Sequence, residues 1–104
     1  MSQKTNLMTI YLSGAITHEP NAKELFAKAK AEAMELYPDA DVINPMQLPH
    51  QHDKSWKSYM KEDIAAMMKC DAIFMLSNFA ISKGACIERK IALDLDMKVI
   101  YQLK

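Results

Sequence analysis

Residues 72–76 read AIFML, and residues 82–88 read SKGACIE. The first stretch is an uninterrupted apolar run, which is typical of a strand that is covered on both faces, as in a parallel sheet. Ser82 can cap a helix that we expect to reach about Asp96, and a last strand follows over residues 98–102. A buried strand, a short loop, a helix and another strand in this order indicate an α/β fold.

Two more strands and a long helix are predicted in the first half of the chain. Residues 7–13 are apolar and rich in β-formers, and residues 41–44 form a short strand that ends at a proline. Between these strands, Asn21 and Glu24 form an Asn-led variant of the capping box, and the helix ends before Pro38. Its predicted apolar face comprises Ala22, Leu25, Phe26, Ala29, Ala33, Leu36 and Tyr37.

A loop over residues 46–55 leads to a second helix, which we expect to run from Ser55 or Trp56 to Lys69. The complete order β-α-β-α-β-α-β predicts a three-layer, flavodoxin- or Rossmann-like fold, with a parallel sheet of about four strands and helices on both faces. We expect one domain over residues 1–104, because the chain is too short for two. The apolar stripe of the second helix, with methionines that we interpret as core-filling, comprises Met60, Ile64, Met67 and Met68.

Ligands bind at the carboxyl ends of the strands in sheets of this kind. This rule points to residues 13–17, to the segment from Asn44 onward, and to residues 77–84. The chain contains two glycines, Gly14 and Gly84, where average usage would give about seven, and both fall inside these segments. We expect that a larger residue at either position harms ligand binding more than folding.

The composition excludes several classes of protein. Thirteen Lys and Arg residues balance thirteen Asp and Glu residues, which argues against a nucleic-acid partner, because such a partner requires a basic excess or stripe. The hydrophobic content of 50% argues against disorder, and no apolar run reaches the roughly 18–20 residues of a membrane span. Because the N-terminal stretch is too polar for a signal peptide, we expect a cytoplasmic protein with no membrane association.

The sequence offers little for a metal or redox site. Cys70 and Cys86 form no CxxC motif, and we expect buried thiols at both positions. Residues 50–53 read HQHD, which looks like a metal cluster, but alternate residues in a loop need not converge and no partner stands at a familiar spacing. We therefore predict neither a metal nor another cofactor.

Glu88 is the first candidate for catalytic chemistry. Its neighbours three and four positions away in the predicted helix are small or apolar, so no cation is available for an ordinary surface ion pair within the helix. These neighbours are Gly84, Ala85, Ile91 and Ala92. They indicate a carboxylate that faces the sheet near the ligand edge, and the alternative is a solvated glutamate that pairs with another segment.

Asp63 and Tyr11 are two further candidates. Asp63 borders the methionine stripe of its helix instead of lying opposite it. Carboxyl groups in such surroundings have raised pKa values, which suits a proton donor, whereas the alternative is an aspartate in water at the edge of the stripe. Tyr11 stands in the first strand, where its hydroxyl can donate to a carboxylate, and the alternative is a core tyrosine.

Five segments of the chain form a wider pattern: YLSGAI at 11–16, INP at 43–45, residues 56–63, CD at 70–71, and SKGACIE at 82–88. Together they resemble the nucleoside 2-deoxyribosyltransferase superfamily, and most closely its small phage- and bacterium-borne branch. The resemblance extends over nearly the whole chain. Its most specific part is the stretch S-x-G-A-x-x-E with an upstream tyrosine and aspartate.

The resemblance implies a role for each candidate. Glu88 stands at the position of the family's glutamate nucleophile, Tyr11 at that of the tyrosine that orients it, and Asp63 at that of the aspartate that protonates or positions the base. Ser82 stands where the transferases commonly have an aspartate, and a serine there is similar to the related branch that hydrolyses deoxynucleoside monophosphates, in which it contacts the phosphate. The residues expected to bind the substrate are Ser13, Gly14, Ala15, Asn44, Ser82 and Gly84.

The function implied by the resemblance is cleavage or transfer at the N-glycosidic bond of a deoxynucleoside or deoxynucleoside monophosphate, through a glutamate nucleophile. It also implies a small-molecule nucleoside or nucleotide as partner and a homodimer or higher homo-oligomer. Family members usually continue beyond the last strand and donate a residue to a neighbouring subunit's site, whereas this sequence stops at Lys104. A non-catalytic module that sequesters or senses a nucleotide is therefore the alternative, and a scaffold for protein contacts is a third interpretation.

Overall fold

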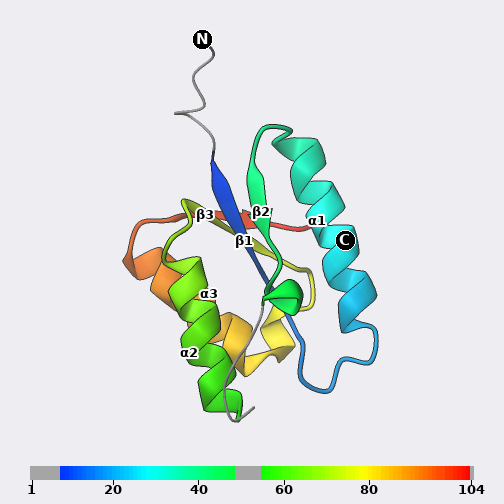
Figure 1. The fold of residues 1–104 in the computed structure, drawn as a ribbon, viewed down its shortest axis with the longest axis vertical. Helices are drawn as coiled ribbons and strands as arrows, with labels where there is room; N and C mark the ends of the chain where they lie inside the picture. Colours follow the sequence, from blue (N-terminus) through cyan, green and yellow to red (C-terminus); the bar gives the residue numbers. More distant parts are fainter. Residues whose placement is uncertain (1–7, 49–54, 104) are drawn as a thin grey trace.

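A parallel sheet forms the centre of the protein (Figure 1). The computed structural model describes residues 8–48 and 55–103. Strand β1 pairs with β2 on one side and with β3 on the other, and β4 pairs with β3, all in parallel. The four strands are β1 (Thr9–Ser13), β2 (Asp41–Ile43), β3 (Ala72–Met75) and β4 (Lys98–Tyr101). This sheet confirms the predicted α/β fold.

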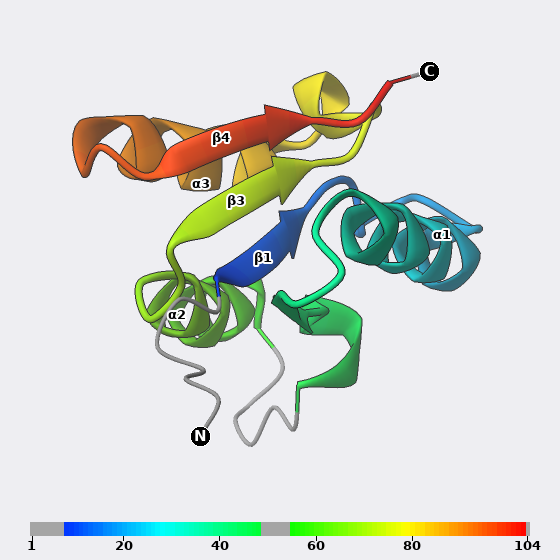
Figure 2. The same cartoon turned by 90° about the horizontal axis from the view of Figure 1, so that it is seen from above.

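Helices cover both faces of the sheet, which confirms the predicted three layers. Helix α1 packs on one face, whereas α2 and α3 pack on the other, and Figure 2 shows α1 and α2 on opposite sides of β1. The helices are α1 (Ala22–Leu36), α2 (Trp56–Met67) and α3 (Lys83–Asp94), with short 3₁₀ turns η1 (Pro45–Gln47) and η2 (Phe79–Ile81). These bounds lie within a few residues of those predicted.

The direction of the connections reverses at β1. The chain leaves β1 through α1 to β2 on one side, returns through α2 to β3 on the other side, and continues through α3 to β4. In open α/β sheets, the crevice at the carboxyl ends of the strands beside such a reversal is the usual ligand site. Here the crevice lies beyond the ends of β1 and β3, where residues 13–17 and 77–84 follow these strands.

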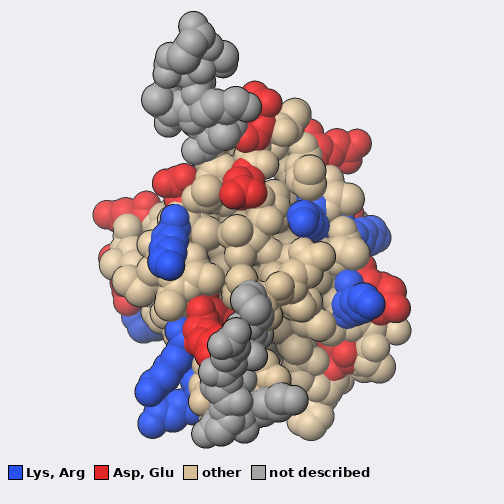
Figure 3. All heavy atoms as spheres, viewed as in Figure 1, with Lys and Arg blue, Asp and Glu red and all other residues tan. Residues whose placement is uncertain are grey.

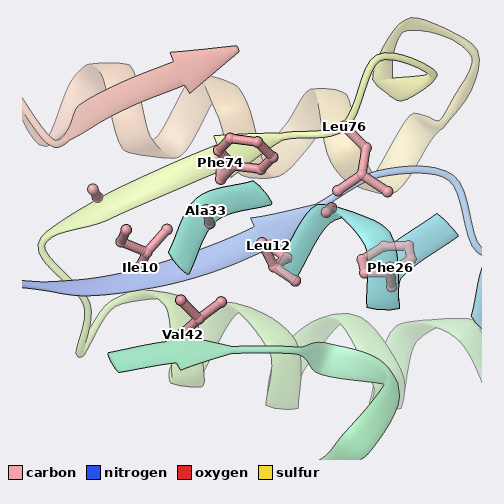
Figure 4. Close-up of a cluster of buried hydrophobic side chains, with 9 residues drawn as sticks. Ile10, Leu12, Phe26, Ala33, Val42, Phe74 and Leu76 are labelled. Atoms are coloured by element: carbon pink, nitrogen blue, oxygen red, sulfur yellow. The ribbon is translucent and has the colours of Figure 1, made fainter. Parts of the chain in front are cut away.

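Alternate residues of β1 pack on opposite faces of the sheet, because side chains in a strand alternate in direction. Ile10 and Leu12 belong to the core under α1, whereas Tyr11 belongs to the core under α2 and α3. The side chains labelled in Figure 4 show the apolar packing on the α1 side: Ile10, Leu12, Phe26, Ala33, Val42, Phe74 and Leu76. The polar groups of β1 are therefore directed to the face under α2 and α3.

The starts of α1 and α3 differ in their capping. Ser82 caps α3 as predicted, because its Oγ accepts a hydrogen bond of 3.0 Å from the backbone N–H of Ala85. The predicted capping box of Asn21 and Glu24 is wrong, since the Asn21 side chain makes no capping hydrogen bond. Its backbone, with φ −103° and ψ 21°, is not extended, and a capping side chain usually needs the extended conformation to reach the helix.

Three side chains that the sequence assigns to the core are exposed. Leu36 is the last residue of α1 and is 61% exposed, and Met68 follows the last residue of α2 and is 57% exposed. Apolar periodicity does not show where a helix extends past the surface that covers it. The third is Cys86, near the start of α3, where the prediction of a buried thiol is wrong because the residue is exposed. Cys70 is half-buried. Met67, by contrast, is fully buried as predicted.

The surface carries both signs of charge. On the face that Figure 3 shows, acidic side chains lie along the upper part, a group of basic side chains lies at the lower left, and both signs occur between them. This distribution agrees with the formal net charge of zero. Within residues 8–48 and 55–103, no helix has the length and apolar character that crossing a membrane requires.

The two glycines differ in what a side chain would meet. A Cβ on Gly14 would lie 2.7 Å from the Cβ of Leu76, whereas a Cβ on Gly84 would lie 2.9 Å from the sulfur of Met60. The Cβ of Leu76 is attached to the backbone and cannot turn away, but the thioether of Met60 lies at the far end of a flexible side chain. Gly14 therefore allows β1 to pack closely against the end of β3, and we expect a larger residue there to cost stability in addition to any effect on ligand binding.

We predict that Gly14→Ala lowers the free energy of unfolding by about 1–3 kcal/mol, the usual cost of overpacking. Gly84→Ala should change it by less than about 1 kcal/mol, because the helical preference for alanine offsets the displacement of Met60. Urea unfolding of both variants beside the wild-type protein measures the difference. Equal losses of stability in the two variants would contradict this assignment.

Candidate active site

A pocket of about 440 Å³ opens at the carboxyl end of β1. Tyr11 from β1, Asp63 from α2 and Glu88 from α3 all lie in its wall. The three residues predicted to be catalytic therefore come together in one place, although they are far apart in the sequence. The predicted binding residues that line the same pocket are Ser13, Gly14, Ser82 and Gly84.

Glu88 is held by two hydroxyl groups of β1. The Oγ of Ser13 donates a hydrogen bond of 2.6 Å to Oε1 of Glu88, and the hydroxyl of Tyr11 donates one of 3.0 Å to Oε2. Glu88 is 5% exposed, so it is buried in the protein and still lines the pocket. Tyr11 and Ser13 are two residues apart in a strand and share one face, which brings both hydroxyls under α3.

Opposing effects set the pKa of Glu88. Burial is the largest of them and raises the pKa, the hydrogen bonds from Ser13 and Tyr11 lower it, and the negative charge of Asp63 raises it. The resulting pKa is about 7, above the ordinary 4.5 of a glutamate. Near neutral pH, Glu88 therefore exchanges between its protonated and ionised forms, and the ionised form can act as a nucleophile.

Tyr11 remains a hydrogen-bond donor throughout the physiological pH range. Burial and the neighbouring charges of Glu88 and Asp63 raise the pKa of the Tyr11 hydroxyl far above its ordinary value. A hydroxyl that keeps its proton can orient a carboxylate, as the resemblance implies for this position. Tyr11 also belongs to the buried core, so it is a core tyrosine whose hydroxyl donates to a carboxylate.

Asp63 is the second buried carboxyl of the pocket. It is 6% exposed and lies on α2, in the same pocket wall as residues of β1 and α3. Its negative charge acts on both Glu88 and Tyr11, which places it near the other two groups. A carboxyl in this position can exchange a proton with a ligand that lies against Glu88.

An aromatic part of the pocket wall was not predicted from the sequence. Trp56, Tyr59 and Met60 line the pocket beside Asp63, all from α2. Their spacing of three, four and seven residues from Trp56 places them on one helical face, and this signal was present in the sequence. Aromatic faces suit contact with a flat ring. The Nζ of Lys83 lies 5.0 Å from the centre of the Trp56 ring, which is a cation–π contact between the start of α3 and this part of the wall.

Two predicted binding residues lie outside the pocket wall. The backbone N–H of Ala15 donates a hydrogen bond of 3.1 Å to Oδ1 of Asn78, so this donor is used within the protein. Asn44 is buried, and its Oδ1 accepts from the backbone N–H of Met46 at 2.9 Å, which caps the short turn η1. Both residues hold the loops around the pocket together and do not line it.

Little in the described residues points to a metal. The segment 50–53, which looks like a metal cluster in the sequence, lies outside the residues that the structure describes. Within residues 8–48 and 55–103, no group of three or more His, Cys, Asp and Glu side chains has the arrangement of a metal site.

Comparison with known proteins identifies a family. Residues 8–101 match the model of a family that is described as a domain of unknown function, DUF4406. No curated protein matches the chain. The matched residues include every strand and helix described above and thus the whole pocket wall. The chain belongs to the DUF4406 family.

Proposed function

We propose that this protein cleaves the N-glycosidic bond of a deoxynucleoside or deoxynucleoside monophosphate, as an enzyme of the nucleoside 2-deoxyribosyltransferase type. The observation that supports this most is the presence of two buried carboxyl groups, Glu88 and Asp63, in the wall of one pocket. Retaining glycosidases use the same chemical pair, with one carboxylate as nucleophile and one carboxylic acid as proton donor. The resemblance of the sequence assigns the same two roles to these residues.

In the first step, an ionised oxygen of Glu88 forms a bond to C1′ of the deoxyribose while the bond from C1′ to the base breaks. The electron pair of that bond leaves with the base, and a nitrogen of the base takes the proton from the carboxyl of Asp63. The sugar has oxocarbenium character in the transition state, which the negative charge of Glu88 stabilises. The products are a glycosyl ester on Glu88 and a free base.

In the second step, water attacks C1′ and passes a proton to the carboxylate of Asp63. The ester bond breaks, and its electron pair returns to the carboxylate of Glu88. A second base in place of water gives transfer, since its nitrogen attacks C1′ and its proton goes to Asp63. Both carboxyl groups end in their starting forms in either case, so the reaction needs no other reactant.

The shape of the pocket suits this class of substrate. Its volume of about 440 Å³ lies within the usual range for small-molecule sites. The aromatic side chains of Trp56 and Tyr59 provide flat surfaces for a base, and Ser82, the cap of α3, also lies in the pocket wall. The proposal includes a cytoplasmic location and a homodimer or larger homo-oligomer. Light scattering of the purified protein tests the oligomeric state.

The direct test is an assay for released base. The purified protein is incubated with a panel of deoxynucleosides and their 5′-monophosphates, with and without a free acceptor base, and the products are separated by chromatography. We expect base release from at least one substrate, and the acceptor distinguishes transfer from hydrolysis. Glu88→Ala should abolish both. Absence of release and exchange with every substrate would overturn the proposal.

Binding can be measured without turnover, because Trp56 is the single tryptophan of the sequence and lines the pocket. A substrate that enters the pocket should change the fluorescence of Trp56 in the wild-type protein and in Glu88→Ala. A nucleotide that changes this fluorescence in both proteins, while the wild-type protein forms no product, would instead indicate a non-catalytic nucleotide-binding module.

A further inference from the structure

The two oxygens of the Glu88 carboxylate accept from different residues of the same strand. Ser13 is 1% exposed, and its hydrogen bond to Oε1 is 2.6 Å long, shorter than the 3.0 Å bond from Tyr11 to Oε2. Oxygen–oxygen distances of about 2.5–2.7 Å are typical of a hydroxyl that donates to a charged carboxylate. The Ser13 bond is therefore the stronger of the two by geometry.

We propose that Ser13 is a positioning residue for Glu88, whose hydroxyl holds the carboxylate in its ionised form and in one orientation, in place of binding the substrate. The kinetic part of this inference rests on the proposed function, but the hydrogen bond and its effect on Glu88 do not. The hydroxyl of a serine carries one proton, and Ser13 donates it to Glu88. Towards a substrate it can act only as an acceptor.

Two donors restrict the carboxylate more than one donor does. The last torsion of a glutamate side chain is broad, because it joins a tetrahedral carbon to a planar carboxyl group. A single hydrogen bond from Tyr11 to Oε2 would leave rotation about this torsion and exchange of the two oxygens possible. The second bond, from Ser13 to Oε1, opposes both movements, since both donors stand on the same rigid strand.

The charges around Glu88 make the Ser13 hydroxyl important for ionisation. Among residues 8–48 and 55–103, the titratable groups that act on Glu88 are Tyr11 from β1 and Asp63 from α2, and Tyr59 of α2 lies in the same pocket wall. Burial and Asp63 both oppose ionisation of Glu88, whereas the hydrogen bonds from Ser13 and Tyr11 favour it. Removal of one of these two donors should therefore shift Glu88 towards its protonated form.

The test compares Ser13→Ala, Ser13→Thr and Tyr11→Phe with the wild-type protein. The titration of Glu88 is followed by NMR of side-chain carboxyl carbons in ¹³C-glutamate-labelled protein, with Glu88→Gln used to assign the signal. We expect Ser13→Ala to raise the titration midpoint of Glu88 by about one pH unit or more, as loss of a hydrogen bond to a charged group implies. Tyr11→Phe should raise it by less, because its bond is longer, and Ser13→Thr should restore the wild-type midpoint.

The same variants are then compared in the base-release assay. In Ser13→Ala, the acidic limb of the pH profile of kcat/KM should move upward with the NMR midpoint, and kcat should fall while KM changes little. An unchanged midpoint of Glu88 in Ser13→Ala would overturn the inference, whether or not a substrate is found. A midpoint that moves in a protein that releases no base from any substrate would overturn the proposed function alone.

Circular dichroism at neutral pH verifies that each variant is folded before titration. Ser13→Ala removes one oxygen atom from a buried site and adds none, so we expect it to fold. A higher KM in Ser13→Ala with an unchanged acidic limb would assign the hydroxyl to substrate binding and overturn the positioning role.

Discussion

Glu88→Gln is expected to abolish base release and to make the protein more stable at alkaline pH. Glutamine has the size of glutamate and can keep hydrogen bonds to Ser13 and Tyr11, but its amide cannot attack C1′. Loss of a nucleophile typically reduces kcat by at least about a thousandfold. The exposed control Glu35→Gln on α1 should leave the rate unchanged.

The stability effect follows from the raised pKa of Glu88, which is about 7 in the folded protein and 4.5 ordinarily. A raised carboxyl pKa means that folding favours the protonated form, so this contribution to stability is complete below about pH 4.5 and is lost as the pH rises through 7. Above that pH, the ionised Glu88 costs on the order of 3 kcal/mol. Glu88→Gln carries no such charge.

Thermal unfolding of Glu88→Gln and wild-type protein at several pH values measures this effect. At pH 8 the melting temperature of the variant should be higher by roughly 10 °C, and the difference should shrink towards zero as the pH approaches about 4.5. Glu35→Gln should show no such dependence. A difference that is the same at both ends of this range would contradict the assignment of a raised pKa to Glu88.

Asp63→Asn is expected to slow base release by about 10²–10⁴-fold for ordinary substrates, the usual contribution of a general acid. In the proposed mechanism, Asp63 gives a proton to the departing base while Glu88 attacks as a carboxylate, and an asparagine at position 63 has no such proton to give. The neighbouring carboxyl of Glu62 on α2 is outside the pocket wall, so Glu62→Gln is the matched control and should retain activity.

The leaving group provides the decisive comparison for Asp63. An N7-methylated purine deoxynucleoside carries its positive charge on the base, which departs as a neutral molecule without a proton from the protein. Asp63→Asn should therefore cleave this substrate at a rate close to that of the wild-type protein. An equal loss with both kinds of substrate would show that Asp63 does not act as the proton donor.

Much of the fold was predictable because its signals are local. The apolar run at 72–76, the periodic apolar face of α1 and the serine that caps α3 each depend on residues within a few positions of one another. Alternating strands and helices then imply a parallel sheet with helices on both faces. The failures were local as well: Asn21 lacks the extended backbone of a cap, and Leu36 and Met68 lie where their helices end.

The candidate site was predictable as a set of residues but not as a geometry. Glu88 and Asp63 stood out because small or apolar neighbours surround them on their own helices. The spacing of Trp56, Tyr59 and Asp63 places the three residues on one face of a helix, which is the aromatic part of the pocket wall. The sequence alone does not show that this face of α2 borders a pocket. Ala15 and Asn44 follow strands, where ligand-binding residues are expected. The N–H of Ala15 and the side-chain oxygen of Asn44 instead make hydrogen bonds within the protein's own loops.

By itself, the sequence determined which elements form and their order, and it singled out Glu88 and Asp63 while leaving open whether they are buried. Only the tertiary structure decided that the hydroxyl of Ser13 meets Glu88, 75 residues away, and that Gly14 packs against Leu76. These contacts depend on the sheet order β2-β1-β3-β4 and on the register of β1 with β3. Propensity and periodicity act between residues that are close along the chain, whereas the site is made by strands and helices that long crossover connections bring together.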